Sequence, residues 1–363
     1  MIYFGIFIFG FSLLQLLVAF VNLVFGQSFS KTKDKPSDLV SILIPARNEE
    51  KNIGNLLNDV QNQEYHNIEI LVFNDQSTDK TSEIVLEHSK SDNRIKLINS
   101  DDLPEGWLGK NFACHSLAKN AKGHYYLFLD ADVRISKDII INTVNQLKKY
   151  KLGLLTIFPK QIMKTWGEWI TVPNMNFILL SLLPLILVRK LKFSSLAAAN
   201  GQFMLFDAQI YQKYKPHELM KDNKVEDIEI ARFYKSEKIT IACLAGNENI
   251  SCRMYQSFKE AVNGFSKNVV NFFGNSYLLT LMFWLITSFG FIVILFSMDY
   301  KFLMFYLIII LFTRIMISLT SRQSVLYNIL LIIPQQLALG MFIYKSVMNK
   351  FKKQHQWKGR NIS

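Results

Sequence analysis

The chain has 363 residues, of which 50% are hydrophobic and 29 are phenylalanine, and its mean hydropathy is +0.15. This composition excludes a purely soluble protein, because so much apolar surface needs lipid as well as a protein core. The formal net charge is +12, but no zinc-finger, RNA-recognition or basic-zipper pattern accompanies it, so we expect no nucleic-acid partner.

The first segment has the length and composition of a membrane anchor. No charged residue occurs from Ile2 to Phe25, and about 24 residues of helix exceed the roughly 30 Å of a hydrocarbon core. The segment lacks the basic start and the A-x-A-like cleavage site of a signal peptide. Three lysines follow it, and the positive-inside tendency then places the next domain in the cytoplasm: Lys31, Lys33 and Lys35. We expect residues 1–27 to be an uncleaved anchor in the cell (inner) membrane.

Cysteine usage agrees with a cytoplasmic domain. The three cysteines form neither an even disulfide framework nor a paired metal spacing: Cys114, Cys243 and Cys252. Such usage is typical of a reducing compartment. We expect no disulfide and no zinc site.

Residues 28–272 have the mixed composition of one globular domain. Short apolar runs typical of buried strands alternate there with segments of helical apolar spacing. The expected strands are 39–45, 68–74, 95–98 and 125–129, and the expected helices are 49–62, 77–89, 110–119 and 136–148. This alternation predicts an α/β fold with a mostly parallel sheet flanked by helices on both faces.

Polar residues follow three of the expected strands. The stretch "PARNEE" ends the first strand, "NDQSTD" the second and "DAD" the fourth. Ligands of parallel sheets bind beyond the carboxyl ends of the strands, so three strands deliver polar groups to one rim. This convergence is a stronger signal than any of the short motifs alone.

The "DAD" stretch suits a divalent cation. Asp130 and Asp132 are two residues apart, so in an extended strand they point the same way and repel unless a cation or donors lie between them. Mg²⁺ is commonly held by one or two carboxylates plus substrate phosphates. The chain has neither a P-loop nor a G-x-G-x-x-G fingerprint. We therefore expect the two aspartates to bind a nucleoside diphosphate through Mg²⁺ or Mn²⁺. The alternative is that the "DAD" stretch is a solvated loop without a metal.

Five motifs in this order resemble the inverting family 2 glycosyltransferases with the GT-A fold, which transfer sugar from nucleotide-sugar donors. The resemblance covers roughly residues 39 to 270, and five ordered motifs are far more specific than one. They are "VSILIPARNEE", "VFNDQSTDKT", "LPEGWLGKNFACHSLAKNAKGHYYLFLDADV", "NGQFMLF" and "VEDIEIARF". "LPEGWLGK" and the later "RMY" and "GFSKN" resemble membrane-bound members associated with carotenoid and hopanoid glycosylation.

The resemblance implies roles for the rim residues. The nucleoside pocket would be lined by Pro45, Ala46, Arg47 and Glu49, and Asp75 would pair with the base. Lys110 would face the donor, Asp132 would hold the metal, and Asp130 would lie near the ribose and phosphates. On local grounds, Arg47 and Glu49 could instead form a helix first turn, Asp75 a turn, and Lys110 a solvated helix start.

Inversion needs a base opposite the leaving diphosphate. The resemblance assigns this base to Asp227, with Glu226 beside it as an acceptor-side candidate. Two acids that merely complement a helix dipole are the alternative. Arg253 could contact the departing diphosphate, or be an ordinary surface arginine.

Three departures from the family pattern limit this interpretation. Asn74 stands where the family often has another acid, and "YKPHE" replaces Gly-Gly-His, which leaves His217 as an acceptor-side candidate or a solvated loop histidine. The Q-x-x-R-W element of processive relatives is absent after Asp227. We therefore expect one or a few sugars per acceptor.

Residues 165–193 are apolar but interrupted by Pro173 and Pro184. The clean core from Phe177 to Val188 is too short to span a membrane. Trp166, Trp169 and trailing basic residues suit a segment at the membrane interface, and a buried core helix is the equal alternative. At the interface it would admit a hydrophobic lipid or isoprenoid acceptor sideways.

Residues 273–345 contain three apolar blocks, Tyr277–Ser297, Phe302–Leu319 and Ser324–Tyr344, before a basic tail at 346–363. Three crossings would put this tail outside, against the positive-inside tendency, so we expect one block not to span. The middle block is the weakest candidate because it is short and contains Arg314. The tail's basic side chains, with Lys345 just before it, would meet anionic headgroups: Lys350, Lys352, Lys353, Lys358 and Arg360.

The sequence thus predicts a multi-pass membrane glycosyltransferase that moves a hexose onto a lipid-embedded acceptor. The expected donor is a UDP-sugar. A membrane nucleotide-sugar-binding or scaffold protein with vestigial catalytic residues is the alternative. A third interpretation, a pore for the glycosylated lipid, has Arg314 as its only hint.

Overall fold

The computed structural model describes residues 1–26, 36–352, 356–357 and 360–361. The chain divides into two compact units, and the boundaries differ from the predicted 28–272 domain. One unit comprises Gln27–Lys160 and Leu185–Cys252; we call it the sheet unit. The other comprises Met1–Gly26, Gln161–Pro184 and Arg253–Ser363; we call it the helical unit. Some lysines used in the membrane predictions lie outside the described residues: Lys31, Lys33 and Lys35 after the first helix, and Lys353 and Lys358 in the tail.

The sheet unit alternates strands and helices as the sequence predicts. Its first half contains β1 (Val40–Ala46), α2 (Ile53–Gln61), β2 (Ile68–Asn74), α3 (Thr81–Ser91), β3 (Ile95–Asn99), α4 (Gly109–Asn120), β4 (Tyr125–Leu129), β5 (Val133–Ile135), α5 (Ile139–Tyr150), β6 (Leu154–Phe158) and the short β7 (Lys160–Gln161) at the unit boundary. The second half contains α8 (Leu185–Lys190), a 3₁₀ turn (Ser194–Leu196), β8 (Phe203–Asp207), α9 (Ala208–Tyr214), α10 (Pro216–Leu219), α11 (Glu226–Ser236), β9 (Ile241–Ala245) and β10 (Ile250–Cys252).

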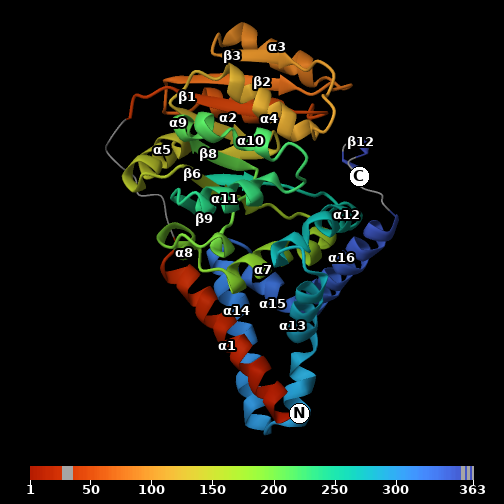
Figure 1. Cartoon of the computed structure of the whole chain (residues 1–363). Helices are drawn as coiled ribbons and strands as arrows, with labels where there is room; N and C mark the ends of the chain where they lie inside the picture. Colours follow the sequence, from red (N-terminus) through yellow and green to blue (C-terminus); the bar gives the residue numbers. More distant parts are fainter. Residues whose placement is uncertain (27–35, 353–355, 358–359, 362–363) are drawn as a thin grey trace. The chain divides into compact units, whose positions relative to one another are not determined.

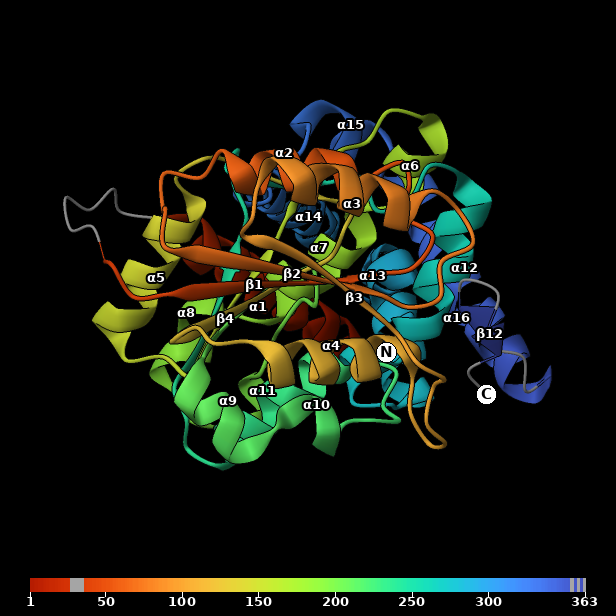
Figure 2. The same ribbon diagram turned by 90° about the horizontal axis from the view of Figure 1, so that it is seen from above.

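Seven strands form one mixed sheet in the order β3-β2-β1-β4-β8-β6-β9. Its pairs are parallel except those that β8 makes with β4 and β6. Helices α2 and α3 lie on one face of β1–β3 and α4 on the other (Figures 1 and 2). Because β8 is antiparallel to β4, the start of β8 lies beside the carboxyl end of β4.

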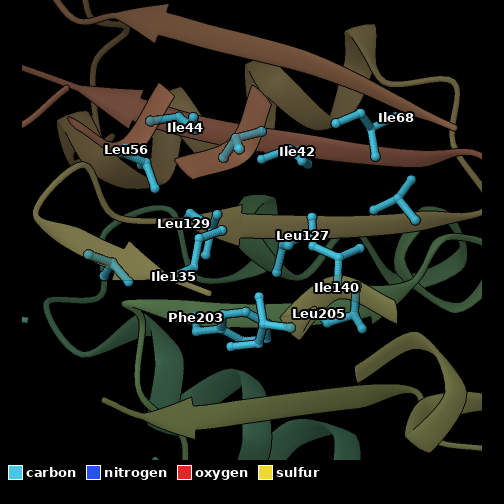
Figure 3. Close-up of a cluster of buried hydrophobic side chains, with 14 of the residues drawn as sticks. Ile42, Ile44, Leu56, Ile68, Leu127, Leu129, Ile135, Ile140, Phe203 and Leu205 are labelled. Carbon is cyan, nitrogen blue, oxygen red and sulfur yellow. The ribbon is translucent and has the colours of Figure 1, made fainter. Parts of the chain in front are cut away.

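The core of this unit lies between the sheet and its helices. Alternate residues of neighbouring strands point to the same side, as Figure 3 shows for Ile42, Leu127 and Leu205. All three are fully buried, and burying such a side chain contributes about 1.5–3 kcal/mol. This packing holds the strand ends in fixed positions.

The helical unit contains α1 (Ile2–Val24), α6 (Trp166–Thr171), α7 (Pro173–Leu182), α12 (Phe258–Asn268), a 3₁₀ turn (Asn271–Phe273), α13 (Tyr277–Ser297), α14 (Tyr300–Thr320), α15 (Val325–Leu330) and α16 (Ile332–Lys352). A short hairpin, β11 (Gln356–Trp357) with β12 (Arg360–Asn361), follows.

Three helices of the described chain are long and apolar enough to cross a membrane: α1, α13 and α14, each with a mean hydropathy of 2.4 in its most apolar stretch. The prediction that the middle C-terminal block is the weakest is therefore wrong. The helix α14 has 21 residues, and its Arg314 is buried against other helices. The last block is instead broken at Leu331 between α15 and α16, and α16 carries Lys345 and Lys350.

The segment 165–193 contributes to both units. Within the helical unit, α7 is buried from Pro173 to Ser181, so for α7 the buried-helix alternative holds. Asn22 of α1 donates through Nδ2 to the carbonyls of Leu180 and Leu183, at 3.0 and 2.9 Å. Gln15 donates to Ser181 Oγ at 3.1 Å. These bonds fix α7 against α1.

Candidate active site

The carboxyl ends of β1 and β2 are joined through Arg47 and Asp75. Arg47 Nη1 donates to the Asp75 carbonyl at 2.7 Å and lies 3.6 Å from Asp75 Oδ2. The Asp75 amide donates to the carbonyl of Ala46, which with Pro45 ends β1. The two charged side chains are only 13% and 4% exposed. A partly buried ion pair thus lies at the predicted nucleoside end of the rim.

The loops after β1 and β2 are tied to each other by side chains. Asn48 accepts a hydrogen bond from the Thr78 amide at 2.8 Å, and the Glu49 amide donates to Thr81 Oγ1 at 2.8 Å. Glu49 Oε2 accepts from Asn52 Nδ2 at 2.8 Å. Since α2 begins only at Ile53, the alternative that Arg47 and Glu49 form a helix first turn is wrong.

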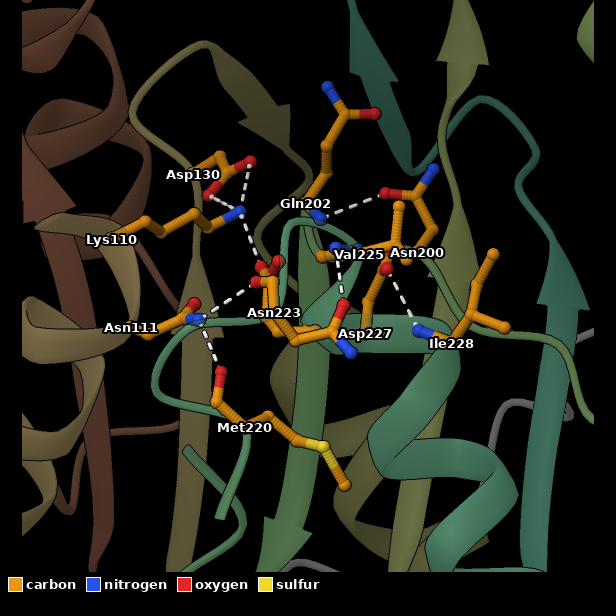
Figure 4. Close-up of polar contacts among 12 residues, drawn as sticks. Lys110, Asn111, Asp130, Asn200, Gln202, Met220, Asn223, Val225, Asp227 and Ile228 are labelled. Atoms are coloured by element: carbon orange, nitrogen blue, oxygen red, sulfur yellow. Dashed lines mark hydrogen bonds and ion pairs between the residues drawn. The ribbon is translucent and has the colours of Figure 1, made fainter. Parts of the chain in front are cut away.

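The predicted residues Lys110, Asp130, Glu226 and Asp227 meet at one place (Figure 4). Lys110 Nζ lies 2.9 Å from Asp130 Oδ1 and 3.4 Å from Glu226 Oε1. Asp130 follows β4, Lys110 is in the first turn of α4, and the two acids begin α11. The alternative of a solvated Lys110 is wrong, because its ammonium bridges two carboxylates.

Asn111 holds the start of α11 close to α4. Its Nδ2 donates to the carbonyls of Met220 and Asn223, at 2.6 and 3.0 Å, and the side chain is 1% exposed. The Leu108 amide donates to the Lys221 carbonyl at 2.8 Å. Leu108, just before α4, and Asn111, in its first turn, thereby fix the loop that leads into Glu226.

Gly201, just before β8, leaves room for this cluster. A Cβ atom there would lie 2.9 Å from Lys110 Nζ, 3.4 Å from Glu226 Oε1 and 3.7 Å from Asp227 Oδ2. The Gly201 amide also donates to Asp227 Oδ2 at 2.9 Å. A side chain at this position would occupy the space where three charged groups converge.

Burial and neighbouring charges change the protonation of the cluster. Burial raises the pKa of Glu226 to about 7, against the attraction of Lys110. Burial also raises the pKa of Asp227, although Lys110 and the amides of Ile228 and Gly201 oppose this. Burial acts to lower the pKa of Lys110, but Asp130 and Glu226 raise it well above its usual value. The lysine is therefore charged, and both acids of α11 are stronger bases than in water.

Asp132 is a buried carboxylate next to a second acid, Asp130. Its Oδ1 is buried and has no hydrogen-bond partner among the described residues. Burial, with the nearby charge of Asp130, raises its pKa to about 6. The Cys252 thiol donates to the Asp132 carboxylate, and Gln202 Nε2 donates to Cys252 Sγ at 2.9 Å.

These features fit Mg²⁺ or Mn²⁺ bound together with a ligand. In the described part of the chain, no three His, Cys, Asp or Glu side chains could hold a metal ion by themselves. Two carboxylates, one with an orphaned oxygen, suit a cation whose remaining positions are filled by water and phosphate oxygens.

Two predicted site residues have other surroundings. Arg253 belongs to the helical unit, where its guanidinium pairs with the buried Glu168, Nη2 to Oε1 at 2.7 Å. His217 is 2% exposed, its ring is 4.8 Å from the Phe128 ring, and it shares a 2.7 Å hydrogen bond with the Tyr211 hydroxyl. The solvated-loop interpretation of His217 is therefore wrong, and its acceptor-side role finds no support.

Sequence reasoning missed the residues that arrange the site. Gly201 and Gln202 lie in the quoted "NGQFMLF" motif, which was a usable signal. Asn111 lies in the quoted "LPEGWLGKNFACHSLAKNAKGHYYLFLDADV" motif, but its main-chain partners lie far along the chain. Cys252 lies in none of the five motifs.

The chain also matches known proteins. Residues 41–215 match the model of "Glycosyl transferase family 2". The 4,4'-diaponeurosporenoate glycosyltransferase of Staphylococcus aureus strain USA300 is 26% identical over 92% of this chain and 91% of its own length, and that of strain MRSA252 is 27% identical over the same shares.

A solved structure covers nearly the whole chain. It is the mannosyltransferase PcManGT from Pyrobaculum calidifontis in complex with GDP-Man and Mn²⁺, with a TM-score of 0.54, 14% identity and coverage of 96% of this chain and 99% of the other. At this identity the likeness concerns the fold alone. The likeness and the mixed sheet show a GT-A-like fold, and residues 41–215 within it are similar to the family 2 glycosyltransferases.

Proposed function

We propose that the chain transfers a hexose from a nucleoside diphosphate sugar to an apolar acceptor in the membrane, with inversion, metal dependence and no processivity. The observation that carries this proposal is the convergence of Lys110, Asp130, Glu226 and Asp227 around Gly201. The Lys110 ammonium, the metal-binding candidate Asp130 and the base candidate Asp227 come from three different elements and converge there.

The donor would lie along the rim of the sheet. Arg47, Asp75 and Glu49, with Pro45 and Ala46, would bind the nucleoside. Asp130 and Asp132 would hold Mg²⁺ or Mn²⁺, which stabilises the charge of the leaving nucleoside diphosphate. Lys110 adds a fixed positive charge beside the diphosphate. We keep UDP as the expected nucleotide; the solved neighbour holds GDP-Man, so both are tested.

Asp227 is our candidate for the base. Its two oxygens accept hydrogen bonds from the amides of Gly201 and Ile228, at 2.9 and 2.8 Å, which hold the carboxylate in one orientation. As the acceptor oxygen attacks the anomeric carbon, the bond from that carbon to the diphosphate breaks and Asp227 takes the hydroxyl proton. Glu226 contacts Lys110 and would help to keep its ammonium charged and in place.

The proposed acceptor is a long apolar molecule that ends in a carboxylate, of the carotenoid class. The curated relatives are named for such an acid, diaponeurosporenoate. A carboxylate is already anionic at neutral pH and needs little help from a base. With this acceptor there is no hydroxyl proton to take, so Asp227 would be less critical than with an alcohol.

The first experiment tests metal and donor. Purified protein in detergent is given UDP-glucose or GDP-mannose, Mn²⁺ and a polyene carboxylate, and nucleotide release is measured. We expect turnover with one donor and its loss in Asp132→Asn, while Asp92→Asn, whose carboxylate pairs with Arg94 at 2.7 Å, is active. Donor binding without turnover would instead favour the scaffold alternative, and full activity of Asp132→Asn would contradict the metal assignment.

The second experiment tests the base. We expect Asp227→Asn to lose about 10²–10⁴-fold with an alcohol acceptor and much less with the matched carboxylic acid. Glu226→Gln should change the turnover of the alcohol and of the carboxylic acid by the same factor. Equal losses with both acceptors in Asp227→Asn would argue against proton transfer to this residue.

A further inference from the structure

The helical unit contains a partly open cavity of about 710 Å³, within the roughly 300–1,000 Å³ range of small-molecule sites. Its walls come from α1, α7, α13, α14, α15 and α16, and they are mostly apolar. Phe11, Phe177, Trp284, Ile309 and Leu337 are among the lining residues. Such walls fit a long hydrocarbon chain.

One charged residue, Arg314 of α14, also lines this cavity. The side chain is 3% exposed, and its guanidinium lies 3.8 Å from the centroid of the Phe177 ring. Arg314 Nη1 donates to Gln335 Oε1 at 3.0 Å. The sequences of the six helices around the cavity contain no Asp or Glu, and within the described residues no carboxylate forms an ion pair with Arg314.

The neighbours of Arg314 are neutral and already engaged. Gln335 Nε2 donates to Asn328 Oδ1 at 3.0 Å and to the Trp169 carbonyl at 3.1 Å. This fixes the Gln335 oxygen toward the guanidinium but supplies no charge. A charged side chain in a membrane segment is costly, and such residues pair or serve a ligand.

We propose that this cavity binds one long-chain carboxylate, with the apolar chain between the helices and the carboxylate on Arg314. A guanidinium presents its donors in a fork that matches a carboxylate bidentately. The compact carboxylate suits a guanidinium that is only 3% exposed, whereas a phosphodiester brings bulky substituents on both sides. The inference deepens the proposed function and rests on it for the physiological occupant, because the acceptor proposed there is of the same class.

The test measures binding without donor or metal, so it is independent of whether transfer occurs. The full chain in neutral detergent is titrated with cis-parinaric acid, a fluorescent polyene fatty acid, and with its methyl ester. Energy transfer from Trp284, which lines the cavity, reports binding, and Trp284→Phe should remove most of that signal.

We expect the acid to bind about tenfold more tightly than the ester, a difference of about 1.4 kcal/mol. Arg314→Gln should abolish this preference and leave ester binding unchanged, and Arg314→Lys should retain part of it. Lys301→Gln, at an exposed position of the same helix, is the matched control.

A second variant addresses the walls. Thr287→Phe should weaken acid and ester alike, because Thr287 lines the cavity and carries no charge. Equal binding of acid and ester by the unmodified chain, or an acid preference that persists in Arg314→Gln, would overturn the proposal and leave Arg314 a purely structural residue.

Discussion

At the scale of single residues, the absence of a side chain at Gly201 is as important as the charges around it. Lys110, Glu226 and Asp227 all lie within 4 Å of the point where a Cβ would stand. The main-chain amide approaches Asp227 because nothing projects between them. A glycine here therefore serves close approach.

Gly201→Ala tests this role. The added methyl group would lie 2.9 Å from Lys110 Nζ, which is the end of a flexible side chain and can move. We expect the free energy of unfolding to change by less than about 1 kcal/mol, within the range of mild substitutions. Displacement of Lys110 should lower kcat about 10–100-fold, as loss of a positioned charge does.

Nucleotide release and thermal unfolding measure the two effects separately. Gly10→Ala is the matched control, because a Cβ at Gly10 meets nothing within 4 Å. An unchanged kcat in Gly201→Ala would show that the missing side chain at this position does not matter for catalysis.

His217 makes the stability of the sheet unit depend on pH. Burial, with the charges of Lys110 and His115, lowers its pKa to about 3, against about 6.5 in an unfolded chain. The folded state therefore binds the proton less well, so the stability is complete above pH 6.5 and falls as the pH decreases toward 3. Between pH 7 and pH 5 the loss is about 2 kcal/mol.

His217→Phe should remove this dependence, although it also loses the hydrogen bond with Tyr211. The measurement is the difference between unfolding at pH 7 and at pH 5, not the absolute stability. His66→Gln, at an exposed position, should behave like the unmodified chain. An acid sensitivity equal to the original in His217→Phe would refute the assignment.

At the scale of elements, the start of α4 organises the site. Asn111 is buried and satisfies two carbonyls before α11. Asn111→Leu would leave these carbonyls without their donor, at a cost of about 1–3 kcal/mol. The loop at 220–224 should then loosen and the contact of Lys110 with Glu226 weaken.

Limited proteolysis measures that loosening. Trypsin should cleave Asn111→Leu after Lys221 or Lys224 faster than the unmodified chain, and activity should fall in parallel. Asn120→Leu, in the same helix but exposed and with its side chain bonded to the Ser116 carbonyl, is the control. Equal cleavage rates would show that other contacts hold the loop.

The sequence predicted the strands and helices of the first half because their apolar periodicity is local. The strand 68–74 and the strand 125–129 were predicted with the bounds they have. The resemblance assigned Lys110 and Asp130 to the same donor, but it did not predict the ion pair between them. The burial of His217 and the division of segment 165–193 could not be, because both depend on tertiary packing that apolar spacing does not encode.

At the scale of the whole molecule, the number of crossings decides where the basic C-terminal region lies. Our interpretation is that α1, α13 and α14 cross and α16 does not, in line with the three helices long enough to span. Two crossings after the sheet unit return the chain to the side on which that unit lies. The conflict with the positive-inside tendency that three crossings would create then disappears.

Cysteine labelling tests this topology. The natural cysteines Cys114, Cys243 and Cys252 are free and buried, so single introduced cysteines report with little background. A membrane-impermeant maleimide should label Asp299→Cys, between α13 and α14, in intact cells. Ser91→Cys in the sheet unit and Lys350→Cys in α16, both at exposed positions, should be labelled only after lysis. Labelling of Lys350→Cys from outside would mean that α16 crosses as well. The chain would then have four spans, and the lysines of α16 would lie outside, against the positive-inside tendency.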